Sequence, residues 1–429
     1  MARPLLFVGD VHLGRRPTGL DGALPHGLEL EALSPTAALR ATVDLALERK
    51  VRAVVFAGDL IDDAEDRFEA IRPLEEAVRR LGAAGISVFG VAGNHDTLAL
   101  PRLAGRIEGF TLLGEGGRWQ LEAIPPIDEG DPPLDLLGWS FPESHVLEDP
   151  TAELEGSGIL AARRPGARLL GVLHGDLLDA GSRYAPLSRH RLAALGADAF
   201  LLGHIHRPDA LTGERPLGYL GSLCALDAGE TGPHGPWLLH LEGETRLEQV
   251  PLSPLRYEAI TLALEEASAR TPDALLAAIR ARLPEGELDP RHTRLVVVRA
   301  TLEGRLSDRQ AVRELAALSV GERQLGGEIP GLVERVDDRT RPALDLQHLA
   351  ERPTPVGHLA RRILALQEGD EAARAALLAD ARARCHDWLS GRWALPPGAS
   401  LAPPLEDRLL PAAWAALEAL LEHSSEGAG

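Results

Sequence analysis

Short apolar runs alternate with segments of helical periodicity along the first 250 residues of the chain. Ser34 and Pro35 are typical of a helix start, and apolar residues then recur at helical spacing to residue 50. A second helix is predicted over 68–81, where Gly82 ends it. Apolar runs too short for helices predict buried strands at 5–12, 51–59, 86–96, 119–124, 134–139, 167–176, 198–206 and 236–242. This alternation predicts a layered α/β domain with partly parallel, buried sheets.

The pattern changes near residue 255. Two further runs, 256–264 and 291–302, predict strands, and between them a helix over 272–283 begins after Thr271. Beyond 351–358 the chain becomes helical and rich in Ala and Leu, with a proline-rich interruption at 393–407 that cannot continue a helix. The predicted domains are 1–254, a small α+β domain at 255–345, and a helical C-terminal region at 346–429.

The last helix is predicted to be amphipathic. Leu410, Trp414, Leu417 and Leu421 fall on one stripe of the segment 410–423. Such a stripe either packs on the helix's own domain or docks a partner, and the sequence does not favour one over the other.

Composition narrows the class of protein. A net charge of −19 on 429 residues argues against a protein that coats DNA by itself, although a metal site or a basic partner can supply local positive charge. Cys224 and Cys385 lie far apart and outside any metal-binding spacing, so we expect free thiols in a reducing cytoplasm. No secretion signal and no apolar run near the roughly 20 residues of a membrane span is found, so no membrane association is expected.

Five of the predicted strands end in metal-binding residue types. Glycines next to most of these residues allow the backbone to turn sharply into a site. Because ligands gather at the carboxyl ends of strands in α/β sheets, residues some 200 positions apart can converge there. These residues are Asp10, His12, Asp59, Asn94, His95, His174, His204 and His206.

The two histidines of "GHIH" predict a metal site much more strongly together with the other strand-end residues than they do alone. In an extended chain His204 and His206 point to the same face, roughly 6 to 7 Å apart, so each can reach a different ion. Alone, the pair would fit an ordinary surface loop better than a metal site. Together with the carboxylates and the amide, the set favours two metal ions that share a bridging carboxylate, activate water and clamp phosphate oxygens.

The motifs GDVH, GDLID, GNHD, HGD and GHIH resemble those of the calcineurin-like metallophosphoesterases, over about residues 3 to 250. The resemblance implies a layered β-sandwich flanked by helices and two divalent ions bridged by Asp59. One ion would be held by Asp10, His12, Asp59 and His206, and the other by Asp59, Asn94, His174 and His204. The ligand types suit Mn²⁺ best, and Zn²⁺ or Fe²⁺ would also bind.

The same resemblance assigns roles to two neighbouring residues. His95 would contact the scissile phosphate and assist the leaving oxygen as a general acid, a role that suits a histidine beside the metal ligands. Asp96 would orient a neighbouring loop from behind the ligands.

Residues after the last histidine resemble the DNA-repair exonuclease branch, that is, the SbcD nuclease subunits and their YhaO-type relatives. The matching positions are Tyr219, Gly221 and Ser222, followed by Gly229, Glu230, Gly232 and Gly235. A small α+β cap and a helical C-terminal region also resemble that branch. The chain departs from it at Cys224 and at His234, where lysine is common, and we expect both positions on the DNA side.

The resemblance implies a DNA exonuclease or endonuclease in which metal-activated water attacks the phosphodiester. It also implies a Rad50/SbcC-like coiled-coil ATPase that binds the helices after residue 355, and it allows a homodimer. Candidate phosphate contacts near the motifs, which as single residues also fit a solvated surface, are Arg15, Arg16, Arg183 and Arg207.

Two other functions fit parts of the sequence. A phosphatase or phosphodiesterase for a small substrate would use the same site but would not need the 170 or so further residues. A non-catalytic scaffold of an ATPase complex would not need the full ligand set or His95.

Overall fold

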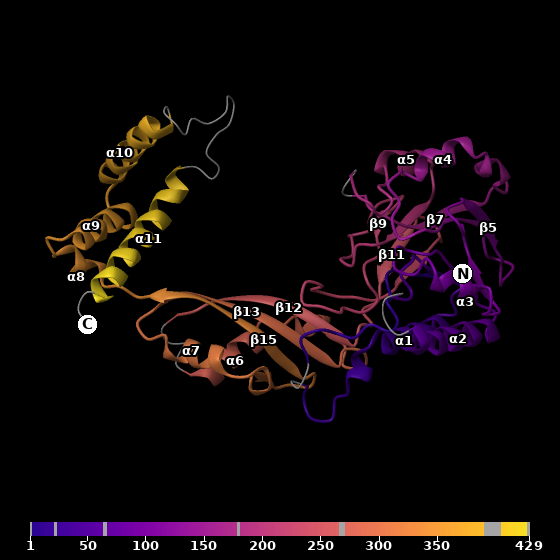
Figure 1. Cartoon of the computed structure of the whole chain (residues 1–429), viewed down its shortest axis with the longest axis horizontal. Coiled ribbons are helices and arrows are strands. Elements are labelled where there is room, and N and C mark those ends of the chain that lie inside the picture. The colour runs from indigo at the N-terminus through magenta and orange to yellow at the C-terminus, as the bar shows by residue number, and fades with distance from the viewer. Residues whose placement is uncertain are drawn as a thin grey trace. The chain divides into compact units, whose positions relative to one another are not determined.

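The computed structural model describes residues 2–20, 24–62, 67–177, 181–265, 271–389 and 405–426. The chain forms two compact units (Figure 1). The first comprises Met1–Gly304 and Arg309–Thr340, and the second comprises Arg305–Asp308 and Arg341–Gly429. The domain boundaries at 254 and 345 remain predictions.

The first sheet of unit 1 contains the N-terminal strand at its centre. Its order is β11-β10-β1-β2-β3-β4, and β1 to β4 are parallel. The strands are β1 (Leu5–Val8), β2 (Ala53–Phe56), β3 (Ser87–Gly90), β4 (Phe110–Leu112), β10 (Trp237–His240) and β11 (Arg246–Gln249). Parallel pairing places the ends of β1, β2 and β3 at one edge of the sheet.

The second sheet has the order β5-β6-β7-β8-β9 and is parallel from β6 to β9. Its strands are β5 (Gln120–Ile124), β6 (Leu134–Trp139), β7 (Arg168–His174), β8 (Ala199–Gly203) and β9 (Leu217–Tyr219). In the ladder between β7 and β8, His174 is paired with Gly203, so the two strands end side by side.

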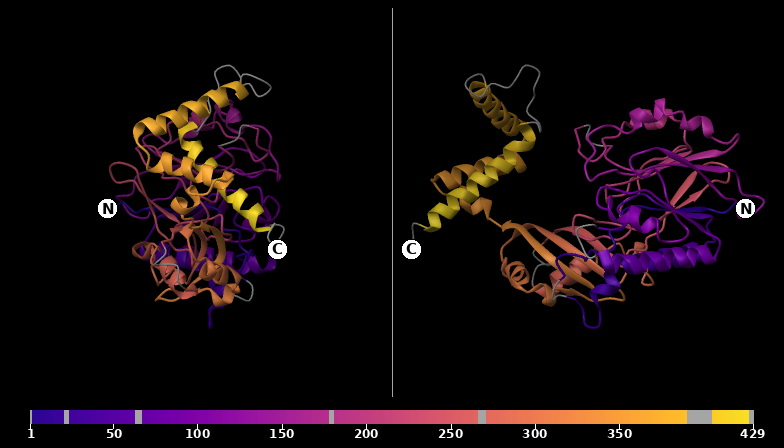
Figure 2. Two further views of the ribbon diagram at one scale, coloured as in Figure 1. Left: turned by 90° about the vertical axis from the view of Figure 1, so that its left-hand side faces the viewer. Right: turned by 45° about the vertical axis from the view of Figure 1, so that its right-hand side comes forward.

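The two sheets pack face to face, and central strands such as β1, β2 and β8 bury both of their sides. In β1, Leu5 and Phe7 belong to the core between the sheets, whereas Leu6 and Val8 belong to the core beneath the helices. Helices α1 (Pro35–Glu48), α2 (Arg67–Ala83) and α3 (Ala99–Ala104) cover the first sheet. Helices α4 (Thr151–Gly156) and α5 (Arg189–Ala194) cover the second. Figure 2 shows these layers. The predicted helix-flanked β-sandwich is confirmed.

A third sheet completes unit 1, in the order β12-β13-β15-β14. Its elements are β12 (Leu255–Ala263), β13 (Leu295–Leu306), β14 (Gln324–Leu325) and β15 (Gly331–Pro342), with α6 (Pro272–Arg280) and α7 (Gln310–Ala317). Tyr257 and Val297 share a buried cluster with Leu20 and Leu33 of the N-terminal region. The Tyr257 hydroxyl also donates a hydrogen bond to the Thr18 carbonyl at 3.1 Å. These contacts join the third sheet to the sandwich.

The second unit is helical, as predicted for the C-terminal region. It contains α8 (Leu346–Ala350), α9 (Pro355–Gln367), α10 (Glu371–Leu389) and α11 (Leu405–Glu426). The Arg305 guanidinium lies 3.4 Å from the ring centre of Trp414, and Leu417 is fully buried. These residues of the C-terminal stripe therefore pack within their own unit.

One prediction about this region was wrong at its end. The interruption was expected to reach residue 407, yet 405–407 already belong to α11, because the last proline of the segment is Pro404. Residues 393–404 lie outside the described part of the chain. None of the described helices has both the length and the apolar character needed to cross a membrane.

Truncating the buried stripe should destabilise unit 2. We expect Leu417→Ala to cost about 2–5 kcal/mol, because the change removes apolar contacts and leaves a cavity. Leu420→Ala on the same helix is the control: its side chain is 38% exposed, so the cost should stay within about 0.5 kcal/mol. Urea unfolding monitored by tryptophan fluorescence measures both, and equal losses would contradict this packing.

Candidate metal centre

The ends of five strands bring the eight predicted residues into one cluster. Three of these residues, His12, Asp59 and His204, adopt positive φ angles of 52°, 48° and 103°. Side chains with a Cβ rarely adopt this conformation, so the surrounding structure must hold it. Gly93 illustrates how closely the loops approach, because a Cβ on it would lie 2.1 Å from Oδ1 of Asp59.

One group of potential ligands consists of Asp10, His12 and His206, whose ligand atoms all lie within 4.8 Å of one another. Nε2 of His12 faces Nε2 of His206 at 3.1 Å. Asp10 is fully buried and His12 nearly so. The carboxylate of Asp10 accepts the backbone N–H of His204, at 3.1 Å from each oxygen.

A second group consists of Asp10, Asp59 and His174. Nε2 of His174 lies 3.0 Å from Oδ1 of Asn94 and 3.4 Å from Oδ2 of Asp59. The ring of His204 contacts the ring of His174, with 5.2 Å between the centroids.

Asp59 lies between the two groups. Its Oδ2 is 3.4 Å from Nε2 of His174 and 3.9 Å from Nε2 of His12. Its position suits a carboxylate that bridges two ions.

Burial controls the protonation of this cluster. It lowers the pKa of His174 to about 3 and that of His204 to about 4, so both imidazoles are neutral at pH 7, the form that binds metals. Burial also raises the pKa of Asp10 to about 7 and raises that of Asp59. Two buried carboxylates this close together need nearby positive charge to stay ionised.

The cluster fits divalent cations better than it fits internal hydrogen bonding. Nδ1 of His12 is buried and, among the described residues, has no hydrogen-bond partner. The two facing Nε2 atoms of His12 and His206 can share only one proton between them. Oxygen and imidazole donors of this kind are the ligands that Mn²⁺, Fe²⁺ and Zn²⁺ accept.

Glu230 supports one ligand from behind. Its Oε1 accepts a hydrogen bond from Nδ1 of His206 at 2.6 Å, and its Oε2 accepts one from the Ser222 hydroxyl at 3.1 Å. Burial lowers the pKa of His206, but the Glu230 hydrogen bond and the carboxylates of Asp10, Glu230 and Asp59 outweigh it and raise the pKa to about 9. This bond fixes the ring so that Nε2 faces the cluster. Sequence reasoning noted Glu230 within a motif but gave it no role.

Asp62 was missed as a functional candidate. Its Oδ1 lies 3.6 Å from Nδ1 of His95, whose side chain is 44% exposed. The backbone N–H of His95 also donates to Oδ1 of Asp59 at 2.9 Å. A partner on Nδ1 leaves Nε2 of His95 available to a substrate. The available signal was the position of Asp62, three residues after Asp59 in "GDLID".

Asp96 is fully buried and links two loops of the site. Its carboxylate accepts backbone N–H groups of Leu60 at 2.8 Å and of Gly93 at 2.7 Å. Because these residues belong to the loops after β2 and β3, the loops that carry Asp59 and Asn94 are held together. The proposed orienting role of Asp96 agrees with this position.

The candidate phosphate contacts occupy different surroundings. Nε of Arg15 lies 3.8 Å from Oδ2 of Asp62, at the edge of the cluster. Arg16, Arg183 and Arg207 have exposed side chains.

The expectation that Cys224 and His234 lie on a DNA-facing surface was wrong. Each side chain is only 1% exposed. His234 faces the Ser222 hydroxyl at 2.9 Å, and burial raises the pKa of the free thiol of Cys224 to about 12. Both positions belong to the segment after β9 and are buried there. An apolar or weakly polar residue is favoured at such positions. The side chain of Cys385 lies outside the described residues.

A groove of about 530 Å³ adjoins the cluster, and Asp62, Asn94, His95 and Tyr184 are among its lining residues. The Tyr184 ring contacts the ring of His204 at 5.2 Å and stacks on His145 at 5.6 Å. A groove of this size is large enough for a nucleotide-sized substrate.

Curated relatives with similar sequences share this domain. The chain is 28% identical over 262 residues to the uncharacterized metallophosphoesterase YhaO of Bacillus subtilis, covering 56% of this chain and 58% of the relative. It is 27% identical over 268 residues to the DNA double-strand break repair protein Mre11 of Aeropyrum pernix, covering 59% and 61%. Each match thus spans about three fifths of the relative's length.

A third relative matches over more of the chain. The SbcD component of the nuclease SbcCD of Rhodobacter capsulatus is 25% identical over 391 residues, covering 82% of this chain and 92% of the relative. The model of the calcineurin-like phosphoesterase family matches residues 3–208, which contain all eight clustered residues. Residues 3–208 therefore belong to the calcineurin-like phosphoesterase family.

Proposed function

We propose that the chain is a metal-dependent phosphodiesterase that cleaves DNA. The observation that carries this proposal is the convergence of seven ligand-type side chains beside a groove where His95 is exposed and paired with Asp62. An enzyme that hydrolyses a phosphodiester needs a water-activating centre, positive charge for the phosphate oxygens and a proton donor for the leaving oxygen.

Two ions, for which Mn²⁺ is the best fit, would each be held by a set of four ligands, and Asp59 would belong to both sets. Asp10, His12 and His206 complete one set, and Asn94, His174 and His204 complete the other. When bound, the ions supply activation of water and stabilisation of negative charge on the phosphate. The buried, neutral imidazoles of His174 and His204 are ready to bind without losing a proton.

His95 would donate a proton from Nε2 to the departing oxygen. Asp62 faces Nδ1 at 3.6 Å and holds the ring in place. Arg15 lies close enough to contact a phosphate in the groove.

The names of the relatives support DNA as the substrate. Mre11 is named a DNA double-strand break repair protein, and SbcD is named as part of a nuclease. The match to SbcD extends over 82% of this chain. For that reason we also propose an ATPase partner for the C-terminal helices, of the coiled-coil type that the sequence resemblance implies. On α10 every side chain with a described environment, from Glu371 to Arg384, is exposed or half-buried.

The proposal is tested with purified protein, added Mn²⁺ and two substrates, an end-labelled DNA duplex and bis(4-nitrophenyl) phosphate. We expect wild type to shorten the duplex and to hydrolyse the diester, and His95→Ala to do neither at a comparable rate. Hydrolysis of the diester without any cleavage of DNA would support the proposed metal centre but would reject DNA as the substrate of the isolated chain. Failure with both substrates would reject the proposal.

Removing the charge behind His206 should weaken metal binding. We expect Glu230→Gln to lower the affinity for Mn²⁺ about 10–100-fold, because the amide no longer fixes and polarises the ring. Isothermal titration calorimetry measures this change.

The control is Glu248→Gln, which alters a second carboxylate–histidine pair outside the cluster. Oε2 of Glu248 lies 3.6 Å from Nε2 of His240, and neither residue belongs to the metal centre. Its Mn²⁺ affinity should equal that of wild type. Equal affinities for all three proteins would show that Glu230 does not support a metal ligand.

A further inference from the structure

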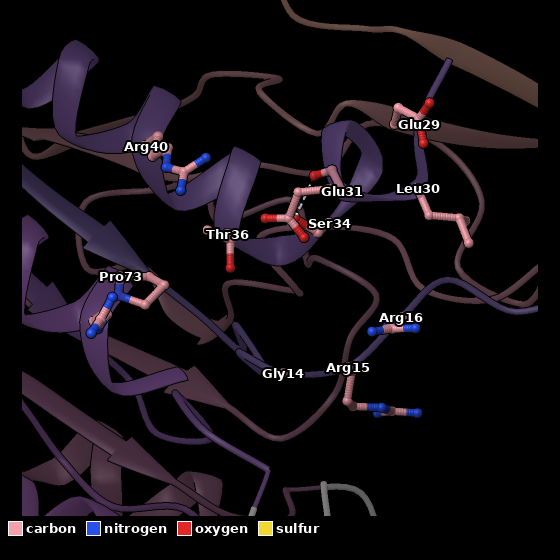
Figure 3. A pocket seen from close by; sticks show the side chains of 11 residues that line it. Gly14, Arg15, Arg16, Glu29, Leu30, Glu31, Ser34, Thr36, Arg40 and Pro73 are labelled. Atoms are coloured by element: carbon pink, nitrogen blue, oxygen red, sulfur yellow. Dashed lines mark hydrogen bonds between the residues drawn. The ribbon is translucent and has the colours of Figure 1, made fainter. Parts of the chain in front are cut away.

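A second pocket, of about 470 Å³, is drawn with its lining residues in Figure 3. Its walls come from the segment after β1, from the region around the start of α1, and from α2. Arg15 lines this pocket, and its Nε is also 3.8 Å from Asp62, which faces His95. Arg15 thus lines this pocket and faces a residue that lines the groove beside the cluster.

Arginine is the dominant charged residue of this pocket. Arg15, Arg16, Arg40 and Arg72 line it, against two acidic residues, Glu29 and Glu31. This balance is opposite to that of the whole chain, whose net charge is −19. A positive pocket on an acidic protein indicates an anionic ligand.

Arg40 on α1 and Arg72 on α2 form no ion pair within the described residues. Other arginines of α2 do: Arg79 pairs with Glu76 at 2.6 Å, and Arg80 pairs with Asp44 at 2.7 Å. The guanidinium groups of Arg40 and Arg72 thus remain available, and arginine matches the geometry of a phosphate with two parallel hydrogen bonds.

A threonine hydroxyl also points into the pocket. The side chain of Thr36 is only 9% exposed, and its hydroxyl has no hydrogen-bond partner among the described residues. Figure 3 shows this hydroxyl directed away from α1 into the pocket. Because this hydroxyl opens into the pocket, it can donate a hydrogen bond to a phosphate oxygen of a ligand there.

We propose that Arg40, Arg72 and Thr36 bind a phosphate group of the DNA strand at a distance from the scissile phosphate. The proposal rests on the proposed DNA-cleaving function and adds that the substrate extends from the metal centre into this pocket. Arg15 and Arg16 then lie along the path of the strand between the two sites. A substrate as small as a single diester does not reach both sites.

The test compares two double variants that remove the same charge. Arg40→Gln with Arg72→Gln alters the pocket, and Arg79→Gln with Arg106→Gln alters a separate pocket of about 490 Å³ that α2 also lines. All proteins carry His95→Ala so that a fluorescein-labelled duplex stays intact, and affinity is measured by anisotropy over a range of salt concentrations.

We expect the first double variant to bind the duplex about tenfold more weakly or worse, because two charge-assisted contacts are lost. Its slope of log affinity against log salt should fall by about 2, one phosphate contact for each arginine. The second double variant should bind within about twofold of the parent. Equal weakening of both variants, or weakening of neither, overturns the inference.

Two further measurements distinguish a failure of this inference from a failure of the proposed function. Hydrolysis of bis(4-nitrophenyl) phosphate by the chain with His95 intact tests the proposed function without involving the pocket, so the two ideas can fail independently. Thymidine 5′-monophosphate is added in a thermal-shift assay. If it stabilises the parent and not the first double variant, while both bind DNA equally, the pocket takes a free nucleotide and the inference is wrong.

Discussion

Asp59→Asn is expected to lower kcat for a small phosphodiester about a thousandfold or more and to leave the chain with at most one metal ion. The carboxylate lies between His174 and His12, 3.4 Å and 3.9 Å from their Nε2 atoms. An amide in this place bridges two cations poorly, because its nitrogen cannot donate electrons to a metal and it carries no negative charge.

The substitution is chosen to preserve the local fold. The asparagine Oδ1 can still accept the backbone N–H of His95, which Asp59 accepts at 2.9 Å in the native chain. Activity and metal content, measured together by diester hydrolysis and atomic emission, should therefore fall, while the thermal unfolding temperature measured for both proteins in EDTA should not. A variant that keeps two ions and full activity would mean that Asp59 is not the bridge.

His95→Gln is expected to lower kcat by about 10²–10⁴-fold without changing the metal content, because it removes a proton donor and no ligand. The loss should be largest for a diester with a poor leaving group, such as a methyl ester, and smaller for the nitrophenyl ester. A good leaving group departs without a proton, so it depends less on a general acid.

Asp62→Asn serves as the companion variant. It keeps a polar group 3.6 Å from Nδ1 of His95 but removes the negative charge beside the ring. Its kcat should lie between those of wild type and His95→Gln, with the same dependence on the leaving group. If His95→Gln loses activity equally for both esters, His95 does not act as an acid.

The fold could be predicted where the sequence pattern reflects burial on both sides of a strand. Runs such as 51–59 and 198–206 correspond to β2 and β8, because strands of a covered parallel sheet are apolar throughout. β15 (Gly331–Pro342) was missed because charged residues interrupt it, and apart from its first three residues only Thr340 is buried. Its strand character comes from its place in the third sheet and not from its own composition.

Site residues that follow the end of a strand could be predicted from the sequence. Site residues that act by contacting another site residue could not be predicted as well. Asp10, Asn94 and His174 are found at strand ends, which the sequence reveals. Asp62 and Glu230 depend on contacts with residues 33 and 24 positions away, namely His95 and His206. No local pattern reports such a contact.

Burial was the property least visible in the sequence. Cys224 and His234 lie in a segment of polar and glycine-rich character, which favours a surface position. In the structure both are covered, with Cys224 Sγ 3.7 Å from the Ser253 hydroxyl and His234 against Ser222. Contacts between segments about 30 and 12 residues apart create this environment.

The central claim is that one cluster of strand-end residues holds two metal ions that share Asp59. The most direct test is anomalous diffraction from crystals grown with Mn²⁺. Two separate anomalous peaks are predicted, one beside Asp10, His12 and His206 and the other beside Asn94, His174 and His204, with the Asp59 carboxylate touching both. A single peak, or none at saturating Mn²⁺, would contradict the account.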